Sequence, residues 1–331
     1  MVKRILITGG MGFIGKNLIK NLTNKNNNYQ IIIIDNLSNS KISDIKNLSN
    51  FYIIKYPKRL TNKKKGIFFY KGDIENKKLL SIVLKNVDTL VHLAANTGVE
   101  ISILNPIKDL KKNILATVQL LEYAREYKIK KFIFSSSNAV IGNYGKKIDE
   151  NSPTNPVNQY GVSKLSAESY INAYNKLYNI KTVILRFSNV YGPGSSNKNN
   201  IIPLFIKKLL KNDICFVHGD GLQTRDFVYI DDLCDAIIKC IKNNNISGKT
   251  FQIGSGKQTT ILNLSRIIAK RISKIKNFPA IIKHSKSRKG DVRVNYSNIN
   301  RAKEILSWQP NTSLHTGINK TINYFTNEKK I

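Results

Sequence analysis

Short apolar runs alternate with helical patterns through the first half of the chain, and this alternation constrains the fold more than any other feature. The runs cover residues 4–8, 31–35, 67–73, 89–95, 131–137 and 181–188, with helical patterns near 12–23, 106–127 and 160–178. Strands that are apolar throughout are buried on both faces, and strands separated by helices run parallel. The sequence therefore predicts an α/β fold with a doubly wound parallel sheet, in which ligands bind at the carboxyl ends of the strands.

The alternation loosens after Ser188, where residues 191–200 (YGPGSSNKNN) have the composition of a loop. We therefore expect a Rossmann-type domain at residues 1–187 and a smaller C-terminal substrate domain at residues 188–331. A chain of 331 residues is long enough for two closely joined domains.

The charge balance, 54 Lys and Arg against 21 Asp and Glu, gives a formal net charge of +33. Such a charge permits binding to nucleic acid or to an anionic membrane. However, Lys occurs together with abundant Asn and Ile, which are residues of A/T-rich codons, so genome composition offers a second explanation. We expect no nucleic-acid partner, and we expect the densest basic cluster, at 55–65, to be a solvated loop.

The three cysteines form no CxxC pair, and their odd count predicts neither a disulfide framework nor a metal site. No apolar run approaches the roughly 18–20 residues that a membrane span needs. The apolar stretch behind the basic N-terminus breaks at Gly9 and Gly10, which is too early for a signal peptide. These features predict a soluble cytoplasmic protein without a metal or a membrane segment.

A glycine-rich loop, TGGMGFIG at 8–15, follows the first strand and opens the first helix. Gly9, Gly12 and Gly15 let the backbone turn and approach a pyrophosphate, whose charge the helix N-terminus favours. We expect this loop, with Phe13 and Ile14 inside it, to bind a dinucleotide.

Two acidic residues at strand ends extend the predicted cofactor site. Asp35 ends the second strand, where a carboxylate binds a ribose diol and repels a 2′-phosphate, so the sequence predicts NAD and not NADP. A turn-capping role for Asp35 is the structural alternative. Asp73, followed by Ile74, ends the third strand and is placed for the adenine amino group, although Gly-Asp is also a common turn.

Tyr160 and Lys164 lie four residues apart in QYGVSK, on one face of a predicted helix. A phenol has a pKa near 10, and a neighbouring ammonium lowers that pKa by favouring the phenolate. By itself this spacing is common in helices. Together with the glycine-rich loop and the serines at 135–137, it predicts an acid–base pair.

These motifs together resemble the extended short-chain dehydrogenase/reductase family, in its NAD-dependent sugar epimerase/dehydratase branch. The resemblance covers essentially the whole chain, through TGGMGFIG, DNLSNS, HLAAN, SSSNAVIG, YGVSK, LRFSNVYGPG, GDGLQTRDFVYIDDL and RKGDVRVNYSNINRAKEILSWQP. It implies catalytic roles for Ser137, Tyr160 and Lys164, with Tyr160 and Lys164 also next to the cofactor. It further implies that Asn36 and Ser38 lie near the adenosine ribose, and that Ala94, Asn113 and Ser135 line the NAD cleft.

The residues after Ser137 bear on the reaction that the resemblance implies. Sugar 4,6-dehydratases of the branch carry an acidic pair there, because the elimination of water needs an acid and a base. This chain has Asn138 and Ala139, which supply neither. The expected reaction is therefore C4 epimerisation of a nucleotide-diphosphate sugar of the UDP-glucose, UDP-N-acetylglucosamine or UDP-glucuronate type.

The resemblance also implies a substrate site in the second half of the chain. It places Asn189 near a phosphate or hydroxyl, Arg225 and Arg288 on the diphosphate, and Asn200 and His218 beside the base. A local ion pair with Asp226 is the alternative for Arg225, and a surface position is the alternative for His218. Asn295 stands where these epimerases gate the sugar pocket, and its small side chain would admit an N-acetylated or oxidised sugar.

Two rival functions remain open at this point. One is a different nucleotide-sugar enzyme of the branch, such as a dehydratase or reductase. The other is a non-catalytic nucleotide- or RNA-binding protein of the same fold, against which the complete set of Ser137, Tyr160 and Lys164 argues. The resemblance also implies a homodimer formed through the helices near 106–127 and 160–178.

Overall fold

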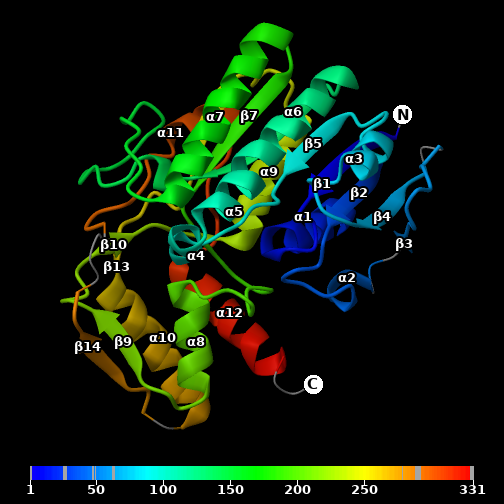
Figure 1. Ribbon diagram of the computed structural model, residues 1–331. Coiled ribbons are helices and arrows are strands. Elements are labelled where there is room, and N and C mark those ends of the chain that lie inside the picture. The colour runs from blue at the N-terminus through cyan, green and yellow to red at the C-terminus, as the bar shows by residue number, and fades with distance from the viewer. Residues whose placement is uncertain are drawn as a thin grey trace. The chain divides into compact units, whose positions relative to one another are not determined.

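The computed structural model describes residues 2–24, 28–46, 48, 50–61, 64–277, 279–287 and 292–328. The chain divides into two compact units (Figure 1). Unit 1 comprises Met1–Val140, Thr154–Arg186 and Cys234–Phe251, and unit 2 comprises Ile141–Pro153, Phe187–Leu233 and Gln252–Ile331. The assignment of NAD binding to residues 1–187 and of sugar-nucleotide binding to residues 188–331 stays a prediction.

An eight-stranded sheet with the order β12-β7-β6-β5-β1-β2-β4-β3 dominates unit 1. The pairs β1–β2, β1–β5, β2–β4, β3–β4 and β5–β6 are all parallel, which confirms the predicted α/β class. The short edge strand β3 was not expected from the sequence. The strands are β1 (Lys3–Thr8), β2 (Tyr29–Asp35), β3 (Phe51–Ile53), β4 (Gly66–Lys71), β5 (Thr89–His92), β6 (Lys131–Ser137), β7 (Lys181–Phe187) and β12 (Lys249–Ile253).

Both faces of this sheet are buried. Ile31 and Ile33 alternate with Ile32 and Ile34 along β2, and none of the four side chains is more than 2% exposed. One face packs against α3 (Lys77–Val83), α6 (Ala116–Glu126) and α7 (Gln159–Tyr178) in a continuous hydrophobic core. On the other face, the side chains of Ile33 and Ile19 meet at Gly10, so α1 (Phe13–Asn24) covers that face.

The strand order reverses between β1 and β5, because β2 lies on one side of β1 and β5 on the other. In open parallel sheets such a switch point leaves a crevice at the carboxyl ends of the strands. The glycine-rich loop after β1, Asp35 at the end of β2 and the serines at the end of β6 all lie at this edge. This arrangement follows directly from the topology.

The predicted helix at 106–127 is interrupted. It consists of α5 (Pro106–Leu110), a π-helical turn η1 (Lys111–Leu115) and α6, and α4 (Val99–Leu104) precedes it. Single π-turns inside α-helices are frequent at functional sites. A 3₁₀ turn, η2 (Asn138–Val140), follows β6, and α2 (Ser43–Lys46) follows β2.

Two lysines attach the C-terminal end of α9 (Ile230–Lys242) to unit 1. Lys131 Nζ donates hydrogen bonds to the carbonyls of Cys240, Ile241 and Asn243, and Lys3 Nζ donates to that of Ile241. A helix C-terminus leaves carbonyls without intrahelical donors and favours positive charge. These contacts explain why residues 234–251 belong to unit 1.

Unit 2 contains three two-stranded sheets and several helices. β8 (Asn189–Tyr191) pairs in parallel with β11 (Phe227–Tyr229), β9 (Cys215–His218) pairs in parallel with β14 (Ile282–Ser285), and β10 (Thr224–Arg225) pairs antiparallel with β13 (Thr259–Thr260). Its helices are α8 (Ile201–Leu210), α10 (Ile261–Lys276), α11 (Asn300–Leu306) and α12 (Leu314–Glu328). Across the described ranges, no helix is long and apolar enough to cross a membrane.

Candidate active site

Ser137, Tyr160 and Lys164 come together in unit 1. Ser137 is the last residue of β6 and hydrogen-bonds the Tyr160 side chain. Lys164 lies one turn further along α7, where its Nζ donates to the Ser135 carbonyl at 2.8 Å and lies 5.9 Å from the Tyr160 ring centroid. The end of β6 and the first turns of α7 thus together carry one group of polar side chains.

The start of α7 is held by two side chains that accept from its unpaired N–H groups. The Asn158 side chain accepts from the Gly161 N–H at 2.9 Å, and Ser102 Oγ accepts from the Tyr160 N–H at 3.1 Å. Such capping satisfies orphan donors and defines where the helix begins. Ser102 lies in α4 and was not singled out from the sequence.

In the protein alone, the pKa of Tyr160 is raised and not lowered. Burial raises it to about 12; the bond from Ser137 opposes that rise and the charge of Asp109 adds to it. For Lys164, burial lowers the pKa to about 8, against the charges of Asp109 and Glu168. The Lys164 ammonium faces the Ser135 carbonyl and lies 4.7 Å from the Phe134 ring centroid, so in the protein alone it does not make Tyr160 acidic.

The glycine-rich loop offers a fit test for a dinucleotide. A Cβ atom on Gly15 would lie 2.5–2.6 Å from backbone atoms of Gly9 and Gly10, so Gly15 is required by packing inside the protein. A Cβ atom on Gly12 would meet only the Gly9 carbonyl, at 3.2 Å, and would otherwise lie in open space. Gly12 therefore leaves room in front of the α1 N-terminus, where a pyrophosphate would approach.

This contrast gives matched variants. Gly15→Ala is expected to destabilise the protein by about 1–3 kcal/mol, the usual cost of overpacking. Gly12→Ala is expected to keep the wild-type melting temperature but to raise the Kd of NAD about tenfold or more, equivalent to ~1.4 kcal/mol. Thermal unfolding without NAD and calorimetric titration with NAD measure the two effects. Equal Kd values for Gly12→Ala and wild type would remove Gly12 from the cofactor site.

Asp35 lies at the end of β2 and contacts the glycine-rich loop. Its carboxylate accepts from the Met11 N–H at 3.0 Å and from the Leu37 N–H at 2.8 Å. Burial raises the pKa of Asp35, while the bonds from Leu37, Met11 and Gly12 hold it down. The Asn36 side chain accepts from the Ser38 N–H, so the predicted ribose-binding residues form one turn.

Asp73 connects to this turn. Its carboxylate accepts from Asn36 Nδ2 at 2.9 Å and from Lys112 Nζ at 2.7 Å. Burial alone would raise the pKa of Asp73, but the bonds from Lys112 and Asn36 lower it. Lys112, in the π-helical turn, also pairs with Glu75 and was not identified from the sequence.

Asn113 is buried in the π-helical turn and uses both ends of its amide inside the protein. Its oxygen accepts from the Asn96 N–H at 2.8 Å. Its nitrogen is within hydrogen-bond distance of three acceptors, the Asn96 carbonyl, Asp109 Oδ1 and Ser163 Oγ. In the structure Asn113 therefore holds the loop after β5 against α7. Its predicted contact with NAD stays a prediction.

A chain of hydrogen bonds joins the end of β1 to the π-helical turn. Thr117 Oγ1 donates to the Asn113 carbonyl, so it accepts from His92 Nε2. The other ring nitrogen of His92 then accepts from Thr8 Oγ1 at 2.7 Å. Burial and the nearby Lys164 charge lower the pKa of His92 to about 3, so the ring stays neutral. No local pattern in the sequence indicates this chain of hydrogen bonds, because its members lie far apart along the sequence.

The other predicted cofactor residues lie around this crevice. Ala94 donates its N–H to Thr8 Oγ1, and Ser135 Oγ donates to the His92 carbonyl. Phe13 and Ile14 open α1, and Ile74 lies in the turn after β4. Their predicted contacts with NAD stay predictions.

In unit 2, Asp226 is hydrogen-bonded to Asn189 and to segments near other predicted substrate residues. Its buried carboxylate accepts from Ser255, Gly256 and Ser297, and its carbonyl accepts from Asn189 Nδ2 at 3.1 Å. Burial raises the pKa of Asp226, although four hydrogen bonds oppose the rise. Asp226 therefore holds the segments that carry Asn189 and Asn295.

Arg225 donates to the carbonyls of Thr224 and Val292. Arg288 lies outside the described residues. Asn200 precedes α8, and Asn295 is half-buried beside the short bridge between Thr224 and Val294.

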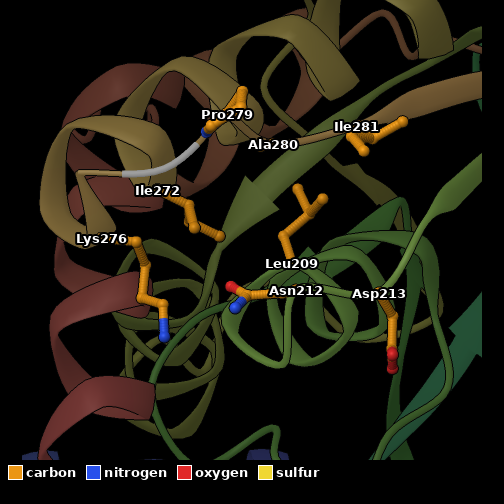
Figure 2. A pocket seen from close by; sticks show the side chains of 8 residues that line it. All are labelled: Leu209, Asn212, Asp213, Ile272, Lys276, Pro279, Ala280 and Ile281. Carbon is orange, nitrogen blue, oxygen red and sulfur yellow. The ribbon is translucent and has the colours of Figure 1, made fainter.

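His218 ends β9, where its Nδ1 hydrogen-bonds Ser285 Oγ at 2.8 Å. It lines a cavity of about 400 Å³ with Leu204, Phe205, Lys208, Phe216 and Ser285. A second cavity, between the end of α8, the end of α10 and the segment before β14 (Figure 2), has a volume of only about 10 Å³, which is too small for a ligand. Over the described part of the chain, no group of acidic, histidine or cysteine side chains is arranged to hold a metal ion.

Comparisons with known proteins show which proteins this chain resembles. Residues 5–254 match the model of the NAD dependent epimerase/dehydratase family. A putative UDP-glucose 4-epimerase of Methanocaldococcus jannaschii is 37% identical over 98% of this chain and 99% of its own length. A dTDP-D-glucose 4,6-dehydratase of Bos taurus is 31% identical over 98% and 88%. The structure of UDP-glucuronic acid 4-epimerase of Bacillus cereus, in complex with UDP-glucuronic acid and NAD, has a TM-score of 0.84 at 31% identity, covering 98% of this chain and 99% of that one.

Proposed function

The chain belongs to the NAD dependent epimerase/dehydratase family, and on this premise we propose that it catalyses C4 epimerisation of a nucleotide-diphosphate sugar. The observation that carries the proposal is the group of Ser137, Tyr160 and Lys164, followed by Asn138 and Ala139. UDP-glucose, UDP-N-acetylglucosamine and UDP-glucuronate are the proposed substrate types.

NAD is the cofactor of this family, and when bound it supplies the hydride acceptor and then the hydride donor, so no net oxidation occurs. The residues proposed to hold it are those of the glycine-rich loop, Asp35 with Asn36 and Ser38, Asp73 with Ile74, and the group at the switch point. The open space at Gly12 and the carboxylate of Asp35 at the sheet edge support this assignment.

Tyr160 Oη is proposed to accept the proton of the sugar 4-hydroxyl and to return it after the sugar has turned over. Ser137 is proposed to hydrogen-bond the same hydroxyl, and Lys164 to favour the phenolate through its charge. Because the pKa of Tyr160 is about 12 in the protein alone, proton transfer needs a further positive charge next to the phenol. Tyr160 would then act as a base only when this positive charge is present.

The sugar nucleotide is proposed to bind unit 2 through Asn189, Arg225 and Arg288, with its base beside Asn200 and His218. A guanidinium pairs with phosphate bidentately, which supports the choice of the two arginines. The cavity of about 400 Å³ lined by Phe216 and His218 supports a position for the base there. Asn295 is proposed to limit the sugar pocket.

A 4,6-dehydratase is the second candidate, because dehydratases are among the relatives. Elimination of water needs an acid and a base beside the sugar. Asn138 has an amide and Ala139 a methyl group at the two positions after Ser137, and this argues for epimerisation.

The deciding experiment is proton NMR of the purified protein with each of the three UDP-sugars, with and without added NAD. Appearance of the C4 epimer of one sugar is the expected result, and it identifies the substrate. A 4-keto-6-deoxy product would establish the dehydratase. No conversion of any of the three sugars would overturn the proposed reaction for these substrates.

A homodimer is proposed from an exposed apolar surface on unit 1. Leu177 and Val162 on α7 are 72% and 47% exposed, and Leu104 and Ile107 beside α5 are 77% and 66% exposed. α5 and the π-helical turn pack against α7, so these exposed apolar side chains belong to elements that lie next to one another. Exposed apolar surface marks interaction sites when it is contiguous, and this supports the proposal.

We expect light scattering to give twice the chain mass of 37.5 kDa. Leu177→Lys is expected to give the monomer mass, because it places a charge in the apolar contact. The matched control is Leu222→Lys, at an exposed residue of unit 2, and it is expected to leave the mass unchanged. A monomeric wild type would refute the homodimer.

A further inference from the structure

Asp109 is a buried carboxylate close to the reacting groups, and nothing above assigns it a function. It lies in α5 and is only 1% exposed. A buried carboxylate is costly unless it is paired or accepts hydrogen bonds. It therefore needs a hydrogen-bond donor or a partner charge.

The other buried charged residues show which charged group is the partner of Asp109. Glu168 is 3% exposed and Arg186 is 6% exposed, and their side chains form a bidentate pair at 2.7–3.2 Å. Ser136 Oγ adds a third donor to Glu168. Glu168 also favours the ammonium of Lys164, which is 2% exposed, but Arg186 compensates the charge of Glu168, so Asp109 is the uncompensated carboxylate that acts on Lys164.

The remaining groups near Lys164 supply no counter-charge. His92 on β5 is neutral, Lys108 and Lys111 are exposed cations, and Lys112 is bound to Asp73 and Glu75. Glu100 on α4 is exposed, and the Glu122–Arg125 pair on α6 lies beside Tyr174, far along α7 from Tyr160. Asp109 interacts electrostatically with both Lys164 and Tyr160.

Asp109 also has a geometric link to Tyr160. Its Oδ1 accepts from Asn113 Nδ2 at 2.9 Å, and the same nitrogen lies 3.1 Å from Ser163 Oγ. Ser163 Oγ in turn donates to the Tyr160 carbonyl at 3.0 Å. The carboxylate therefore orients the amide that joins the π-helical turn to the first turn of α7.

We propose that Asp109 is a positioning residue of this site: it is the counter-ion that keeps Lys164 charged, and it fixes the Asn113 amide that supports Tyr160. The effect of Asp109 on catalysis rests on the proposed function. Its negative charge favours the ammonium and opposes the phenolate, so Tyr160 stays protonated until positive charge arrives. In the protein without a bound cofactor, Asp109 thereby disfavours ionisation of Tyr160.

Asp109→Asn tests the charge, because it removes the charge while keeping size and an acceptor oxygen. In protein carrying ¹³Cζ-tyrosine, the Tyr160 resonance, assigned by its absence in Tyr160→Phe, is expected to titrate about one pH unit or more lower than in wild type. If the epimerase assay works, the alkaline limb of kcat is expected to move to lower pH as well, because Lys164 loses its proton earlier. Glu100→Gln, an exposed carboxylate on the neighbouring helix, is expected to move neither.

An unchanged Tyr160 titration in Asp109→Asn would overturn the proposal, whatever happens to the activity. The titration needs no substrate, so a failure of the proposed reaction leaves this test intact. If Asp109→Asn folds poorly, Lys164→Met with and without Asp109→Asn decides the point by melting temperature. The double variant is expected to melt higher than Lys164→Met, because it removes an unpaired buried carboxylate. A double variant that melts lower would exclude the counter-ion role.

Discussion

Tyr160→Phe is expected to lower kcat by a factor of about 10² to 10⁴, the usual contribution of general acid–base catalysis. The substitution removes only the hydroxyl, so the ring keeps its packing near Lys164. Ser137 is the hydrogen-bond partner of Tyr160 and is not expected to replace the phenol as the acid–base group. We therefore expect kcat to fall strongly, while the free energy of unfolding changes little.

The effect is measured by kinetics with the UDP-sugar that the NMR experiment identifies as the substrate. The matched control is Tyr170→Phe, on the same helix, where the side chain is 46% exposed and a lost hydroxyl should not matter. The pH dependence adds a second check. Because the pKa of Tyr160 is raised, the acidic limb of the wild-type pH profile should rise with pH as a larger fraction of the phenol is ionised, and this rise should be absent from any residual rate of Tyr160→Phe. Retention of wild-type kcat by Tyr160→Phe would remove Tyr160 from the mechanism.

Arg186→Met is expected to destabilise the folded protein by about 3–5 kcal/mol, because it leaves the buried carboxylate of Glu168 without its cation. The Arg186 and Glu168 side chains are 7% and 4% exposed. Ser136, which donates to Glu168, directly precedes Ser137, so the loss is expected to disturb the end of β6 as well.

Urea unfolding measures the cost. Adding Glu168→Gln to Arg186→Met is expected to recover part of the stability, because it removes the unpaired charge. Arg125→Met serves as the control, since the Arg125–Glu122 pair is about half exposed and should leave the unfolding midpoint unchanged. Equal midpoints for Arg186→Met and wild type would show that the buried pair does not hold the sheet edge.

Local patterns in the sequence were sufficient for the fold class and for the position of the main motifs. The glycine-rich loop, Asp35, Ser137 and the Tyr160–Lys164 spacing each lie within one strand, turn or helix, where periodicity fixes the geometry. The family resemblance then extended these motifs to an activity. The membership of residues 234–251 in unit 1, however, depends on Lys3 and Lys131 reaching the end of α9, and no local pattern encodes that.

The surroundings of the reacting groups were decided by the tertiary structure alone. Asp109, Ser102 and His92 lie 55 to 72 residues before Lys164 in the sequence, and the strand order and the π-helical turn bring them to the site. In the protein alone the pKa of Tyr160 is raised, because spacing places Lys164 one turn away but does not determine how far the phenol is desolvated. A motif determines which groups are adjacent along the chain, whereas the free energy of a charge depends on everything packed around it, and only the folded chain determines that packing.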